Sequence, residues 1–187
     1  GRDTDNADPM TKDSHLFWYR LVTIVWFPVQ FCLIFGTLLY IQDAPHLSTG
    51  ERIALFFGIG VTSGTIGINY AHELMHQRTR LERWMGDLLM TSVLYGHFRS
   101  EHLLVHHSYV GTPRDPVTAR YNEGFHRFFP RVLWQCWRSA FRAEKGMLAR
   151  RGLPVWSGRN PFWKYGVLQS AFLLLAYGIG GWGGVFL

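Results

Sequence analysis

Five of the nine histidines fall into two short groups whose spacing suits metal binding. His72 and His76 form the first group, and His102, His106 and His107 form the second. Each group contains two histidines four residues apart, a spacing that places both side chains on one face of an α-helix. His107 would lie about 100° further round that helix than His106, so we expect it to turn toward a neighbouring ion. The pattern therefore predicts a site with two metals.

The first group alone would also fit zinc, because His72-Glu73-x-x-His76 matches the H-E-x-x-H motif of zinc proteases. In that interpretation Glu73 is the base and a third ligand lies further along the chain. The second group would then be surplus, since a catalytic zinc site takes three protein ligands. Imidazole also suits iron. We therefore favour a dinuclear iron site and retain a membrane zinc protease and a non-enzymatic membrane protein as alternatives.

The remaining histidines and the cysteines show no comparable pattern. His15, His46 and His126 each stand alone and are expected to have no special role. Cys32 and Cys136 offer neither a metal-ligand spacing nor a disulfide framework.

Long apolar segments flank the histidines and predict a membrane protein. Residues 16–42, 53–71 and 162–187 are almost wholly apolar, and about 20 such residues span the hydrocarbon core of a bilayer. Tyrosine and tryptophan near the ends of the first segment are typical of membrane interfaces. The second segment runs directly into His72, so we expect the first histidine group where a membrane helix meets water.

The segments between these spans are shorter or polar. Residues 1–15 are expected to form a loop and residues 43–52 a polar turn. Residues 84–95 are apolar but too short to span, so they should lie in the interface or re-enter the membrane. Such a segment returns the chain to the side from which it came, which would let the two histidine groups meet.

Positive charge is concentrated between residues 99 and 164, which carry most of the arginines, whereas the turn at 43–52 has only Arg52. Under the positive-inside rule the basic side, and both histidine groups with it, face the cytoplasm. The net charge of +6 does not indicate nucleic-acid binding, because the basic residues flank membrane helices. We expect residues 114–159 to contact anionic lipid or to dock an acidic electron carrier, with Arg138 and Arg142 among the docking residues.

The histidine groups lie within longer motifs that resemble those of the membrane-bound alkane hydroxylases (alkane 1-monooxygenases), within the wider group of fatty-acid desaturases and hydroxylases. The resemblance is carried by N-x-x-H-E-L-x-H at residues 69–76 and G-H-F-x-x-E-H-x-x-x-H-H at residues 96–107. It continues through T-P-x-D-P, E-G-F-H-R-F-F-P and R-R-G-L-P-V-W-S, which begin at residues 112, 123 and 150. The chain departs from the family pattern at Gln77, where a basic residue is common, and at Val105, where glycine is common.

This resemblance implies a non-haem diiron enzyme that hydroxylates the terminal methyl of medium- or long-chain alkanes. O2 would be the co-substrate, rubredoxin and its reductase would supply electrons, and the alkane would enter from the bilayer. The implied fold is all-α, a polytopic transmembrane bundle of the inner membrane with its histidine boxes at the cytoplasmic face. Xylene-type and fatty-acid methyl hydroxylases or desaturases remain as alternatives.

The resemblance also assigns roles to single residues. The five grouped histidines become iron ligands. Glu73, His97, Glu101 and Asp115 are expected to lie next to these ligands without binding the metal themselves. A ligating imidazole usually donates its second N–H to such a carboxylate. The family's third histidine box is expected beyond Leu187. We therefore interpret residues 1–187 as part of one desaturase-like membrane domain, truncated at both ends and not expected to be active alone.

Overall fold

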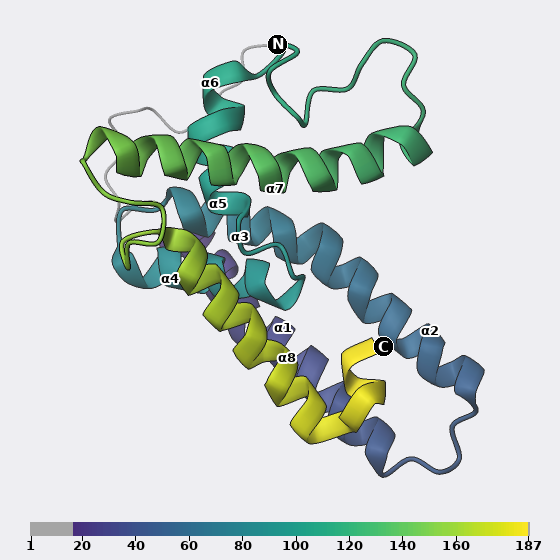
Figure 1. Cartoon of the computed structure of the whole chain (residues 1–187). Helices are drawn as coiled ribbons and strands as arrows, with labels where there is room; N and C mark the ends of the chain where they lie inside the picture. The colour runs from purple at the N-terminus through teal and green to yellow at the C-terminus, as the bar shows by residue number, and fades with distance from the viewer. Residues whose placement is uncertain (1–16, 187) are drawn as a thin grey trace. The chain divides into compact units, whose positions relative to one another are not determined.

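A computed structural model describes residues 17–186, and all the regular structure in this range is helical (Figure 1). The prediction of an all-α fold is confirmed. Three helical stretches are long and apolar enough to cross a membrane: Phe17–Gln42, Thr49–His76 and Pro161–Phe186. These agree closely with the predicted spans. Residues 1–15, predicted to form a loop, lie outside the described residues.

The chain divides into two compact units between Leu89 and Met90, and each is described by itself. The N-terminal unit begins with α1 (Phe17–Gln42). A second apolar helix follows as three segments: α2 (Thr49–Thr62), the π-helical η2 (Ser63–Gly67) and α3 (Ile68–His76).

The second apolar helix begins at Thr49, four residues earlier than its predicted start at residue 53. Its first turn is fixed by a capping box. The Ser48 hydroxyl accepts a hydrogen bond from the Glu51 amide at 3.3 Å, and Glu51 Oε2 accepts one from the Ser48 amide at 2.8 Å. Because these two bonds satisfy backbone groups that a helix start leaves unpaired, the polar residues before the apolar run become helical.

Within this unit α1 packs against α2, η2 and α3. A glycine allows a close approach here, because a Cβ placed on Gly67 would overlap Gln30 Oε1. Gln30 is buried, and its Oε1 accepts a hydrogen bond from Trp26 at 2.8 Å. Small residues permit close packing of membrane helices. That holds at Gly67, whereas Gly58 and Gly60 have no atom near the position of an added Cβ.

Helix α4 (Arg80–Ser92) follows the first histidine group. Near its start, Glu82 is buried and binds Arg20 of α1 through two hydrogen bonds of 2.8 and 3.0 Å, and the Thr79 hydroxyl also donates to it. Further along, a Cβ on Gly86 would lie 2.9 Å from both the Ala71 carbonyl oxygen and Met75 Cγ. Helix α4 is therefore held against the helix that carries His72 and His76.

The C-terminal unit contains the second histidine group and the longest polar helix. Its elements are α5 (Phe98–Glu101), the π-helical η3 (His102–His106), α6 (His107–Tyr109), α7 (Phe125–Arg150) and α8 (Pro161–Phe186). Segments α5 and η3 pack against α7. The Ser100 hydroxyl donates to Glu144 of α7 at 2.6 Å and lies 2.8 Å from the Tyr165 hydroxyl of α8. One side chain of α5 thus links α5, α7 and α8.

The loop between α6 and α7 is fixed by Arg131. Its guanidinium donates to both oxygens of Glu123 at 2.6 Å, and to the carbonyl oxygens of Pro116 and Thr118 at 2.9 and 3.3 Å. These charge-assisted bonds hold the pKa of Glu123 down at about 2. The loop therefore has a defined shape, which positions Asp115.

Candidate metal centre

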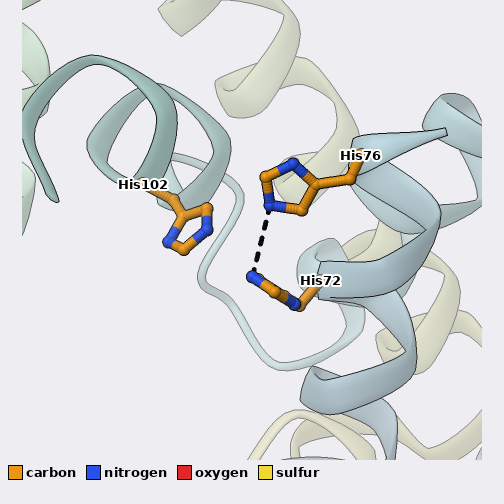
Figure 2. Close-up of side chains that lie close together, drawn as sticks. All are labelled: His72, His76 and His102. Carbon is orange, nitrogen blue, oxygen red and sulfur yellow. Dashed lines mark hydrogen bonds between the residues drawn. The ribbon is translucent and has the colours of Figure 1, made fainter. Parts of the chain in front are cut away.

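The first histidine group has the geometry predicted for an i, i+4 pair on one helical face. His72 and His76 lie on α3, and their Nε2 atoms are 3.3 Å apart. Figure 2 shows the two rings turned toward each other across one helical turn. On its other side, His72 Nδ1 lies 3.2 Å from Glu73 Oε1. That carboxylate can hold the ring in the tautomer whose Nε2 has a lone pair for a metal.

The second group pairs differently from the prediction. Residues His102–His106 form a π-helical turn, which needs one more residue per turn than an α-helix to return to the same face. His102 and His107, five residues apart, therefore converge, with their Nε2 atoms 2.9 Å from each other. The expectation that His102 and His106 form the pair while His107 turns away is wrong, because it assumed a regular α-helix. His102, also labelled in Figure 2, is buried.

His106 is held by a carboxylate from the loop. Its Nδ1 lies 3.0 Å from Asp115 Oδ2, and the Asp115 side chain is fully buried. The same oxygen accepts a hydrogen bond from the Thr118 hydroxyl at 2.7 Å, while Oδ1 accepts one from the Val117 amide at 3.1 Å. Asp115 is therefore held in place by the loop itself, through Val117 and Thr118. Its contact with Nδ1 directs His106 Nε2 away from the loop.

Glu101 lies beside the second group and is almost completely buried. Burial, reinforced by the nearby charge of Asp115, raises the pKa of Glu101 to about 7. Among the described residues its Oε1 has no hydrogen-bond partner, and the Cys136 thiol of α7 contacts the carboxyl group. A buried carboxyl with an unsatisfied oxygen is costly, and a bound cation nearby would satisfy it.

His97 is the fourth residue expected to lie next to the ligands without binding the metal itself. Its Nε2 is buried and has no hydrogen-bond partner among residues 17–186, and its ring packs edge-on against Tyr95. Burial lowers the pKa of His97 to about 4. The imidazole is therefore neutral at physiological pH.

Both histidine pairs have the separation that a shared ion requires. Imidazole nitrogens bind a divalent transition metal at about 2.0–2.1 Å, so two neighbouring ligands of one ion are roughly 2.8–3.4 Å apart for octahedral to tetrahedral angles. The Nε2 atoms are 3.3 Å apart in the first group and 2.9 Å apart in the second. Each group therefore offers a chelating pair of the ligand type that iron, zinc and copper accept.

Comparison with known proteins gives the chain its family. A profile of the fatty acid desaturase family matches residues 52–187, which include both histidine groups. The chain belongs to the fatty acid desaturase family. The predicted resemblance is confirmed at this level.

Several curated proteins are similar to this desaturase-family chain. Alkane 1-monooxygenase 1 of Pseudomonas aeruginosa is 33% identical over 95% of the chain, and alkane 1-monooxygenase 2 of Alcanivorax borkumensis is 38% identical over 72%. The hydroxylase component of the Pseudomonas putida xylene/toluene monooxygenase is 31% identical over 79%. These stretches cover 47%, 35% and 41% of the respective relatives. The chain thus spans about half the length, or less, of the curated relatives it matches.

Two participants in this site carried no recognisable signal in the sequence. Cys136 showed no ligand spacing, yet it contacts Glu101 from α7. Arg131 seemed to be one of many basic residues, yet it organises the loop that carries Asp115. Both act through contacts across the fold, which residue spacing does not encode.

Proposed function

We propose that this chain carries the histidine-bearing part of a membrane-bound diiron monooxygenase. In the proposal the protein binds two iron ions, with His72, His76, His102, His106 and His107 as ligands divided between them. The observation that carries it is the convergence of two Nε2 atoms within each group, at 3.3 and 2.9 Å. The remaining ligands would come from the part of the protein that the relatives possess and this chain does not cover.

The residues of the chain contribute orientation and charge. Glu73 and Asp115 each lie against the Nδ1 of a histidine, which would leave Nε2 as the metal-binding atom. Buried Glu101 and Asp115 would offset the positive charge of ions held by neutral imidazoles. Two ferrous ions, when bound, would activate O2 so that, with two electrons from an electron carrier and two protons, one oxygen atom enters a C–H bond and the other leaves as water.

The favoured substrate is the terminal methyl group of a medium- or long-chain alkane that enters from the bilayer. Support comes from the similarity to alkane 1-monooxygenases and from three apolar stretches long enough to span a membrane. The similarity to a xylene/toluene monooxygenase component favours an aromatic methyl group as the second candidate. Membranes that contain the full-length protein should convert octane to 1-octanol. Preferred conversion of p-xylene or a fatty acid would reassign the substrate.

The metal is tested most directly in the purified full-length protein. Elemental analysis should find two irons per protein for the diiron proposal. One zinc would instead favour the metalloprotease interpretation of His72-Glu73-x-x-His76, and the absence of any bound metal would favour a non-enzymatic membrane protein. Each outcome selects one of the three functions considered.

For the electron supply we propose an acidic carrier of the rubredoxin type, reduced by its own reductase. A pocket of about 580 Å³ lies between η3 and α7, and its lining includes Arg114, Arg142 and Arg150 of the same unit. Opposite charges steer encounter and make it dependent on salt. Reversing Arg114 and Arg142 to glutamate should slow reduction by rubredoxin without removing iron. Unchanged rates with unchanged salt dependence would remove this part of the proposal.

We place the histidine groups on the cytoplasmic side of the inner membrane, because the basic residues lie in the same part of the chain. The turn between α1 and α2 would then face the periplasm. In a Cys32→Ser background, Ser48→Cys should react with a membrane-impermeant maleimide added to intact cells. Labelling only after the cells are opened would reverse the orientation.

A further inference from the structure

Helix α7 carries an exposed aromatic stripe that the metal site does not use. Its members are Leu133, Trp134, Trp137 and Phe141, which fall within a sector of about 100° around the helix axis. The tryptophans are 61% and 44% exposed, and Leu133 is 44% exposed. The buried face of the middle of α7, formed by Val132, Cys136 and Ala140, lies on another side. The stripe is therefore not the surface that packs against α5 and η3.

Basic residues form the neighbouring sector of the same helix. Arg127, Arg138 and Lys145 are exposed and follow one another about two to three turns apart, beside the stripe. A helix with a large aromatic face bordered by lysine and arginine is typical of segments that lie in the plane of a membrane interface. The aromatic rings then reach the boundary between headgroups and acyl chains, while the basic groups stay among the headgroups.

The stripe is joined to the start of a membrane-length helix. Phe162, in the first turn of α8, contacts Phe141 with ring centroids 5.1 Å apart and Trp137 with centroids 6.4 Å apart. Pro161–Phe186 is one of the three stretches long and apolar enough to span a membrane. In Figure 1, α8 starts alongside α7 and runs away from it in a different direction. The stripe thus faces the region where a spanning helix would enter the bilayer.

Two further exposed tryptophans lie at the start of α8. Trp156, in the loop before α8, is 74% exposed, and Trp163, in its first turn, is 58% exposed. Tryptophan is enriched where membrane helices cross the interface, because its ring has an apolar body and a polar N–H. Four exposed tryptophans therefore gather around the end of one predicted span.

We propose that α7 is an in-plane interfacial helix whose stripe of Leu133, Trp134, Trp137 and Phe141 inserts at the boundary between headgroups and acyl chains of a membrane that contains anionic phospholipids. The lipid surface is favoured over a protein partner because the stripe contacts the start of a predicted span and is bordered by basic residues. The pocket formed by Arg114, Arg142 and Arg150 lies on another side of the helix. It would therefore remain available to a water-soluble partner.

The test uses the full-length protein in phosphatidylcholine vesicles that contain phosphatidylglycerol, with single spin-labelled cysteines. Cys32 is replaced by serine, whereas Cys136 can remain because it is buried and burial raises the pKa of its thiol to about 12. Labels at Leu133→Cys, Trp134→Cys and Trp137→Cys should collide with dissolved O2 several-fold more often, relative to an aqueous nickel chelate, than a label at Ala149→Cys. The control position is exposed, lies outside the stripe and is not one of the basic residues beside it.

Two outcomes would overturn the assignment. Equal access of the nickel chelate to stripe and control positions would show that the stripe faces water. Shielding of the stripe from both O2 and the chelate would show that protein covers it.

A second experiment tests the contact with anionic headgroups. In it, Arg127, Arg138 and Lys145 are changed together to glutamate. This change should lower the ratio at position 134 with phosphatidylglycerol present and leave it unchanged in pure phosphatidylcholine. An equal fall in both would refute the headgroup contact. These measurements require neither metal nor turnover, so they stand apart from the proposed chemistry.

Discussion

The two histidine groups reach the same local geometry by different backbone routes. In α3 a regular helix brings residues 72 and 76 together, whereas in η3 a π-helical turn brings residues 102 and 107 together. The Nε2 separations of 3.3 and 2.9 Å are nevertheless similar. What the two groups share is therefore the placement of nitrogen atoms and not the spacing of residues.

The surroundings of the groups differ more than their geometry. The carboxylate beside His72 belongs to the next residue, and the Glu73 side chain is 59% exposed. The carboxylate beside His106 comes from a loop, is fully buried and is fixed by Thr118 and the Val117 amide. The first group is built locally on a partly exposed face of α3, whereas the second depends on contacts with the loop and with α7 in its unit. Substitutions in and around the two groups test this difference, and they are described from the largest expected effect to the smallest.

The largest effect is expected from the histidines themselves, and a double variant tests the π-helical pairing. In the full-length protein, His102→Ala and His107→Ala should each remove about one iron and lower hydroxylation by more than about a hundredfold. Because both are inferred to bind the same ion, the double variant should lose no more iron than either single variant. The measurement is iron content per protein, together with product formation.

The matched controls for this series are His46→Ala and His126→Ala, which should keep full iron content and activity. If the His102/His107 double variant loses both irons while each single variant loses one, the two residues bind different ions. The pairing across η3 would then not describe the metal-bound site. Full metal content in all the second-group variants would refute the dinuclear site altogether.

The next effect concerns the carboxylates behind the histidines. Asp115→Asn should weaken iron binding by about 10–100-fold, because a buried charge that orients His106 is lost. Glu73→Gln should have a smaller effect, since water can replace an exposed carboxylate. Titration of the apoprotein with Fe²⁺ measures both, and Thr118→Val, which removes one hydrogen bond to Asp115, serves as an intermediate control. Equal losses for Asp115→Asn and Glu73→Gln would contradict the difference in burial.

Packing in the N-terminal unit is tested at Gly86. Gly86→Ala would place a Cβ 2.9 Å from the Ala71 carbonyl oxygen, and this overpacking should lower the free energy of unfolding by about 1–3 kcal/mol. Gly58→Ala is the control, because no atom lies near the added Cβ and alanine is the better helix former. Thermal unfolding of the full-length protein in detergent compares the two. A similar loss of stability in both variants would show that α4 does not pack closely on α3.

The smallest predicted effect is a pH dependence in the C-terminal unit. Burial lowers the pKa of His97 from 6.5 to about 4, so between these values the unfolded chain binds a proton that the folded chain does not. Stability should therefore fall as the pH drops from 6.5 to about 4 and level off below, with a total change on the order of 1 kcal/mol for this partly exposed ring. His97→Phe should remove this slope in unfolding measurements, whereas His126→Phe at an exposed position should leave it unchanged. A slope that survives His97→Phe would assign the effect to another group.

The sequence predicted the features that depend on local pattern. The three apolar stretches and the pairing of His72 with His76 follow from run length and from the period of the α-helix, and both agree with the structure. The family could also be recognised from the motifs around the two groups. Local pattern was sufficient for the apolar stretches and the His72–His76 pair because each lies within one continuous helical run.

Features that depend on packing were missed or mistaken. Nothing in H-L-L-V-H-H distinguishes a π-helical turn from an α-helical one, and this segment is packed against α7. The early start of α2 depends on a reciprocal pair of hydrogen bonds between Ser48 and Glu51. The role of Arg131 depends on a loop whose path spacing does not reveal. In each case a contact, and not a periodicity, decides the local structure.

The ion pair between Arg20 and Glu82 has a consequence for the synthesis of the chain. Arg20 leaves the ribosome 62 residues before its partner, an interval of roughly 3–12 s at about 5–20 residues per second. During this time α1, which is otherwise suited to insert early, carries a cation whose final carboxylate does not yet exist. Helix α1 can enter the membrane at once, but its final position is fixed only when α4 emerges. The order of translation thus separates insertion of α1 from its docking against α4.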